Sequence, residues 1–131
     1  MAVELRVLAY GAILLLVHIV LAGHFKTKQY GIGWNMGARD EELPPMNAVA
    51  GRLARAQANF METFPIAIVA LGGVVLAGKT SQVTAMAAWV WLGARVLYLP
   101  LYWAGVRRIR TLVWMAGTIS LLVVLWALVS V

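Results

Sequence analysis

Polar side chains gather in the stretch GRLARAQANFMETFP, residues 51–65, directly before one of the most apolar runs of the chain. In an α-helix, positions i, i+3, i+7 and i+10 fall on one stripe. Here those positions hold Arg52, Arg55, Asn59 and Glu62. Guanidinium, amide and carboxylate groups on one helix face can bind the charged ends of a small ligand. This face therefore needs a protein or ligand partner if the helix lies in lipid.

A second stripe lies in GARVLYLPLYWAG, residues 93–105, where Arg95, Tyr98 and Tyr102 follow i, i+3, i+7 spacing. Arg95 is more than a turn inside an apolar segment, where an unpaired cation costs about 2.5–3.5 kcal/mol. It must therefore have a partner. One interpretation is a lone ion pair with Glu62, with the tyrosines at the membrane interface. The other is a shared ligand site, which the two matching stripes and the run RRIRT, residues 107–111, favour.

The charge balance of these residues predicts an anionic ligand. Glu62 is outnumbered by the arginines at positions 52, 55, 95 and 110. Glu62 and Asn59 can receive an ammonium or amide group, so we expect a small zwitterion with excess negative charge. Arg110 and Thr111 lie where the last helix should begin, and a helix N-terminus also favours an anion. An arginine there can hold a thiolate, because cations lower thiol pKa values from about 8.5.

The composition places these residues in a membrane protein. Of 131 residues, 63% are hydrophobic and 12% are charged, and the mean hydropathy is +0.84, outside the range of soluble globular domains. The net charge of +6 is spread among apolar segments, so we predict no nucleic-acid partner. The chain has no cysteine, and His18 has no second histidine or acid at compatible spacing, so we predict no metal site.

Four apolar segments are each long enough to cross about 30 Å of hydrocarbon at about 1.5 Å per residue. They predict an all-α fold, an integral membrane four-helix bundle that forms a single domain over residues 1–131, with helices at about 5–23, 46–77, 83–105 and 111–131. The small residues Ala50, Ala54 and Ala58 favour close approach of another helix. We expect the tryptophans mostly at the membrane interfaces or facing lipid.

Lysine and arginine are unevenly divided between the connections. The connection 24–45, the start of the second helix and the third connection carry most of them, namely Lys26, Lys28, Arg39, Arg52, Arg55, Arg107, Arg108 and Arg110. Only Arg6 and Lys79 lie on the opposite side. This bias predicts that the connection 24–45 is cytoplasmic and that both termini lie outside, in the inner (plasma) membrane if the source is bacterial.

The segment RAQANFMETFP resembles the helix 2 motif of the MAPEG family, the membrane-associated proteins of eicosanoid and glutathione metabolism. In that motif an Arg-Ala-x-x-Asn-x-x-Glu core is followed by a proline, as in Arg55, Ala56, Asn59, Glu62 and Pro65 here. The set Arg95, Tyr98, Tyr102, Arg110 and Thr111 is similar to the rest of the family's glutathione site. The resemblance runs from end to end of the chain and is to a bacterial-type member.

The resemblance implies a homotrimer that binds glutathione, as co-substrate, between adjacent protomers near the cytoplasmic side. The implied binding residues are Arg55, Gln57, Asn59 and Glu62 of one protomer, which face Arg95, Tyr98 and Tyr102 of the next, with Thr111 at the start of the last helix. Arg110 would stabilise the thiolate that attacks a lipophilic electrophile or hydroperoxide, which makes the protein a membrane-bound glutathione-dependent transferase or peroxidase.

Several alternatives remain open from the sequence. Arg107 and Arg108 compete with Arg110 for the catalytic position, and either Lys26 or Lys28 can supply a basic residue from the first helix. Gln57 lies about 200° round the helix from Arg55, so its implied role has the least geometric support. The alternative function is a non-catalytic lipid-binding or scaffold protein on the same fold.

Overall fold

The computed structural model describes residues 1–131 and contains four helices that are long and apolar enough to cross a membrane. The all-α prediction is therefore confirmed. The helical elements in chain order are α1 (Val3–Tyr30), α2 (Ile32–Met36), α3 (Ala48–Ala67), the π-helix η1 (Ile68–Gly72), α4 (Gly73–Leu76), α5 (Gln82–Trp103) and α6 (Arg108–Val129). The elements α3, η1 and α4 follow one another without a break and form the second long helix.

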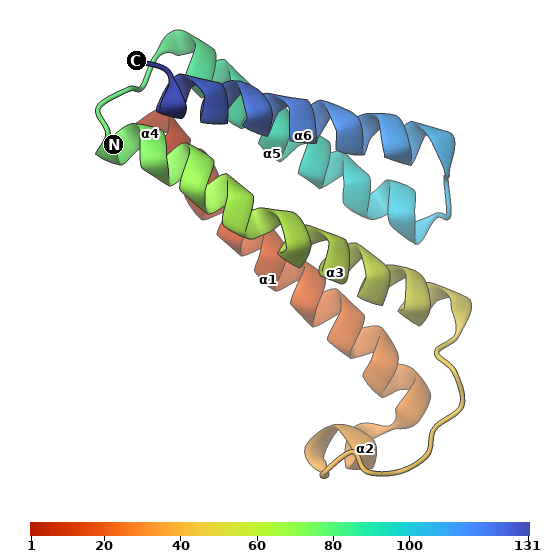
Figure 1. Ribbon diagram of the computed structural model, residues 1–131. Helices are drawn as coiled ribbons and strands as arrows, with labels where there is room; N and C mark the ends of the chain where they lie inside the picture. Colours follow the sequence, from red (N-terminus) through yellow and green to blue (C-terminus); the bar gives the residue numbers. More distant parts are fainter.

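The long helices form two antiparallel pairs, α1 with α3 and α5 with α6 (Figure 1). Both chain termini lie at one end of the bundle, and the connection from α5 to α6 lies at the other. Phe25 of α1 still packs edge-to-face on Trp103 of α5, with 5.5 Å between ring centroids. Beyond Phe25 the last turns of α1 carry α2 away from α5 and α6. One side of α3 therefore packs against α5, while Arg55 and Glu62 of its polar face are exposed.

The core is organised around Trp91 of α5, which is only 1% exposed. The expectation that tryptophans mostly face lipid is wrong for this residue, because α1 approaches α5 too closely for lipid to enter. A Cβ atom on Gly11 would lie 2.5 Å from the Trp91 ring, so only glycine allows this approach. Phe64 of α3 stacks on Trp91 beside Gly11, with ring centroids 6.2 Å apart and planes 21° apart. Three helices thus meet at one indole.

Particular residues explain where the second long helix begins and where it changes from α-helix to π-helix. Asn47 caps α3, since its side chain accepts a hydrogen bond from the Ala50 N–H at 2.9 Å. Pro65 lies inside α3 and cannot donate a hydrogen bond to the carbonyl of Met61. The helix becomes π-helical directly after this region, at Ile68–Gly72. The regular polar face of α3 therefore ends shortly after Glu62.

The connection between α1 and α3 is held to the last turn of α1. The Tyr30 hydroxyl donates to the Pro44 carbonyl at 2.7 Å. Gln29 donates to the Pro45 carbonyl at 3.0 Å and accepts from the Asn47 N–H at 2.8 Å. These bonds fix where α3 starts relative to α1, and hence where its first arginines lie.

Candidate functional site

The two predicted stripes meet within one chain. Arg95 Nη1 on α5 donates a hydrogen bond to Asn59 Oδ1 on α3 at 2.9 Å. The resemblance implied that these walls face each other across a protomer boundary. Within one chain Asn59 and Arg95 are already in contact, because α3 and α5 pack together. The ion-pair interpretation is wrong within this chain, since the remaining nitrogens of Arg95, Nε and Nη2, have no hydrogen-bond partner and so make no bond to Glu62.

Arg95 is compensated by aromatic rings instead of by an acid. Its guanidinium carbon lies 4.7 Å from the ring centroid of Phe60 and 4.5 Å from that of Tyr98. A desolvated cation–π contact contributes about 2 kcal/mol, which offsets part of the cost of a cation in the membrane. Arg95 is only 3% exposed. It therefore lies behind Asn59 and Tyr98 and supports them from the core.

Four arginines surround a recess at the end of the bundle where α5 joins α6. This arginine recess has a volume of about 310 Å³ and is lined by Arg52, Arg55, Tyr102, Gly105, Arg107 and Arg110, with no acid among them. Arg52 Nε donates to the carbonyl of Trp103 at 2.8 Å, which ties α3 to the end of α5. Gly105 has a φ of 76°, a left-handed conformation that favours glycine and turns the chain beside Arg52. The recess is electropositive.

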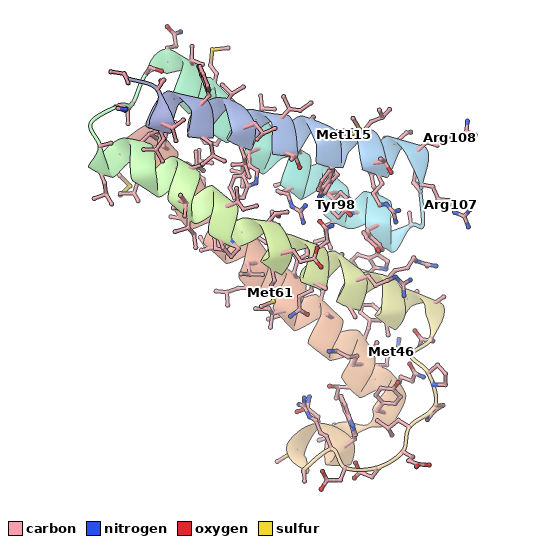
Figure 2. All side chains as sticks on the ribbon, viewed as in Figure 1. Met46, Met61, Tyr98, Arg107, Arg108 and Met115 are labelled. Atoms are coloured by element: carbon pink, nitrogen blue, oxygen red, sulfur yellow. The ribbon has the colours of Figure 1, made fainter.

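Arg110 is distinguished from its neighbours by its contact with the tyrosines. Its guanidinium carbon lies 4.4 Å from the Tyr102 ring centroid, and Tyr102 packs edge-to-face on Tyr98 at 5.5 Å between centroids. Arg107 and Arg108 are exposed and project at the end of the bundle, whereas Tyr98 lies on α5 inside it (Figure 2). A continuous row thus leads from Arg110 through both tyrosines to Arg95.

The other predicted residues are less closely joined to this row. Arg55 and Glu62 are exposed on α3. The Thr111 N–H and hydroxyl both donate to the Arg107 carbonyl at 3.2 Å, so both donors are used within α6. The Gln57 amide reaches Met61 Sδ at 3.8 Å, on a different face of α3 from Arg55.

The basic residues of α1 do not line the arginine recess. Lys28 lines a separate cavity of about 510 Å³ between the end of α1 and the start of α3, together with Phe25, Gln29, Asn47, Ala48 and Val49. Its Nζ lies 6.0 Å from the Phe25 ring centroid. Within one chain, α1 therefore supplies no basic side chain to the recess.

Sequence reasoning missed Phe60 and Gly105. Phe60 is 1% exposed and lies between Arg95 and His18, whose ring centroid is 4.9 Å away. In the sequence, only its position directly after Asn59 connects Phe60 with the site. A phenylalanine in an apolar helix does not by itself indicate a functional residue. The only indication of Gly105 in the sequence is that it is a glycine in the connection between two predicted helices. His18 bonds its own helix, with Nδ1 2.8 Å from the Leu14 carbonyl.

Comparison with known proteins gives one match that covers almost the whole chain. The model of the MAPEG family matches residues 5–130. No curated protein and no solved structure matches the chain. The matched range includes all of the residues that line the arginine recess and both polar stripes.

Proposed function

Because the chain belongs to the MAPEG family, we propose that it is a membrane-bound glutathione-dependent transferase or peroxidase that acts on lipophilic substrates. The family includes glutathione-dependent enzymes. The observation that carries the proposal is the arginine recess, in which Arg55, Arg110 and Tyr102 line one cavity that no acid neutralises. The four long helices support an integral membrane protein, in which we expect a hydrophobic substrate to reach the recess from the lipid.

Glutathione has the charge that the recess requires. It carries more carboxylate than ammonium groups, and guanidinium groups bind carboxylates through paired, charge-assisted hydrogen bonds. We assign its carboxylates to Arg55 and its neighbours in the recess. Asn59 and Glu62, further along the same face of α3, can accept the ammonium and amide N–H groups.

Arg110 is the residue to which we assign thiol activation. A guanidinium beside the sulfur favours the thiolate, and the thiol proton leaves to solvent. The thiolate then forms a C–S bond to an electrophilic carbon while the leaving group departs with its electron pair. With a hydroperoxide, the sulfur takes the distal oxygen and the O–O bond breaks to give an alcohol. A second glutathione then forms the disulfide and releases water.

A homotrimer would complete the site. Arg55, Ala58 and Glu62 are exposed on α3 of one chain, and a neighbouring protomer would cover them. Gln57 points from a different face of α3 and can join a site that contains Arg55 only when it comes from a second copy. We place the arginine recess on the cytoplasmic side, of the inner (plasma) membrane if the source is bacterial, and both termini outside, in agreement with the distribution of basic residues.

The first test is glutathione binding to the detergent-purified trimer by calorimetry. Turnover of chlorodinitrobenzene and of a lipophilic hydroperoxide is then measured. Saturable binding with turnover of either compound supports the proposal. Absence of saturable binding overturns it, whereas binding without any turnover would favour a non-catalytic lipid-binding or scaffold protein.

A further inference from the structure

A third, smaller cavity lies between α3, α5 and α6, further from the end of the bundle than the arginine recess. Its volume is about 10 Å³, and it is lined by Thr63, Trp91, Arg95, Trp114, Gly117, Thr118 and Leu121. This is close to the smallest volume that holds one water-sized particle. None of the residues to which we assigned glutathione's thiolate or carboxylates lines it.

The lining of this cavity has hydrogen-bond donors without acceptors. Arg95 is 3% exposed, and its Nε and Nη2 are buried without a partner. The Nε1 of Trp114 is buried and unpartnered as well. Arginine and tryptophan side chains can only donate, and buried donors in native proteins are nearly always satisfied. Something that accepts hydrogen bonds should therefore occupy the space between them.

The charge of the lining distinguishes an anion from a water molecule. A water would accept at most two of these hydrogen bonds, and it would leave the guanidinium of Arg95 without a counter-ion in the membrane. A monovalent anion accepts from all of the donors and neutralises the cation. The hydroxyl of Thr118 can provide a further donor beside them, whereas the Thr63 hydroxyl already donates to the carbonyls of Asn59 and Phe60 at 3.4 and 3.3 Å.

We propose that this cavity binds a single halide-sized monovalent anion. Nε and Nη2 of Arg95 and Nε1 of Trp114 hold the ion, and Thr63 and Thr118 complete its surroundings. Thr63, Trp114 and Thr118 are half-buried, so their side chains can move outward to admit an ion slightly larger than water. The bound ion fastens α6 to the Arg95–Asn59 contact between α3 and α5. The site needs neither glutathione nor turnover.

The test uses the detergent-purified, full-length protein without glutathione, with bromide as the probe. Thermal unfolding is followed while bromide replaces gluconate at constant ionic strength. A ligand that binds only the folded state raises the Tm in a saturable manner. Crystals grown in bromide should show an anomalous peak within hydrogen-bonding distance of Arg95 and Trp114.

Trp114→Phe keeps the aromatic ring and removes only the donor. We expect the bromide concentration for half-saturation to rise about tenfold, as for the loss of one hydrogen bond to a charged group. Trp89→Phe alters an exposed tryptophan outside the cavity and should leave the bromide response unchanged. A linear response that is the same in wild type and Trp114→Phe would be a general salt effect and would overturn the proposal. A cavity with density but no anomalous signal would hold water and would overturn it too.

Discussion

Arg110 lies over the ring of Tyr102, with its guanidinium carbon 4.4 Å from the ring centroid. This contact joins the first turn of α6 to the last turns of α5 across the connection between them. The contact also distinguishes Arg110, which is half-buried, from Arg107 and Arg108, which are exposed. An arginine that is fixed by an aromatic face can present its N–H groups in one direction, which electrostatic stabilisation of a thiolate requires.

Removing the ring under Arg110 should impair catalysis more than folding. For Tyr102→Leu we expect kcat/KM for glutathione to fall about fivefold, because a partly exposed cation–π contact contributes about 1 kcal/mol and a misplaced arginine stabilises the thiolate less well. Tyr102→Phe keeps the ring and should retain most of the activity. Steady-state kinetics on both variants give the comparison. Equal loss in both would show that the hydroxyl, and not the ring, is the important feature.

Arg95→Lys should lower both stability and glutathione affinity. Lysine lacks the planar guanidinium that bonds Asn59 and contacts Phe60 and Tyr98, so we expect a loss of about 2–3 kcal/mol in the free energy of unfolding. Thermal unfolding and calorimetric titration with glutathione measure the two effects.

Arg108→Lys changes an exposed arginine and is the matched control for Arg95→Lys. Its free energy of unfolding should change by less than about 0.5 kcal/mol. If Arg95→Lys were as stable as this control, the aromatic compensation of Arg95 would be refuted.

The contact of Gly11 with Trp91 predicts a steric effect on the bundle. A side chain at Gly11 meets the indole at 2.5 Å, so Gly11→Ala should destabilise the protein by about 1–3 kcal/mol. Gly23, in the same helix, has no atom within 4 Å of the position a Cβ would take. Gly23→Ala should therefore be neutral or stabilise the helix by about 0.5–1 kcal/mol. Unfolding in a denaturing detergent compares the pair, and equal stability of the two variants would argue against close packing of α1 on α5.

Helix periodicity was sufficient to predict the polar stripes and the all-α fold. Asn59 and Arg95 could each be assigned to a stripe because the α-helical repeat fixes which side chains share a face. The sequence also indicated that Arg95 needs a partner. It did not identify that partner, because the choice between Glu62, Asn59 and the aromatic rings depends on how α3 and α5 pack.

The burial of individual aromatics was beyond sequence reasoning. Trp91 and Trp126 lie in equally apolar helices, yet their side chains are 1% and 72% exposed. In a membrane protein the lipid-facing and core-facing sides of a helix are both apolar, so hydrophobicity does not distinguish them. Trp91 is buried because Gly11 lets α1 approach its ring. This contact joins segments that are distant in the sequence.

The ultraviolet absorbance of bound glutathione tests most directly the proposed activation of its thiol by Arg110. The measurement is made at neutral pH and saturating glutathione, on wild type, Arg110→Ala and Arg107→Ala. We predict a thiolate band in wild type and in Arg107→Ala, and its loss in Arg110→Ala while glutathione still binds. A band that persists in Arg110→Ala, or that disappears only in Arg107→Ala, would contradict the assignment.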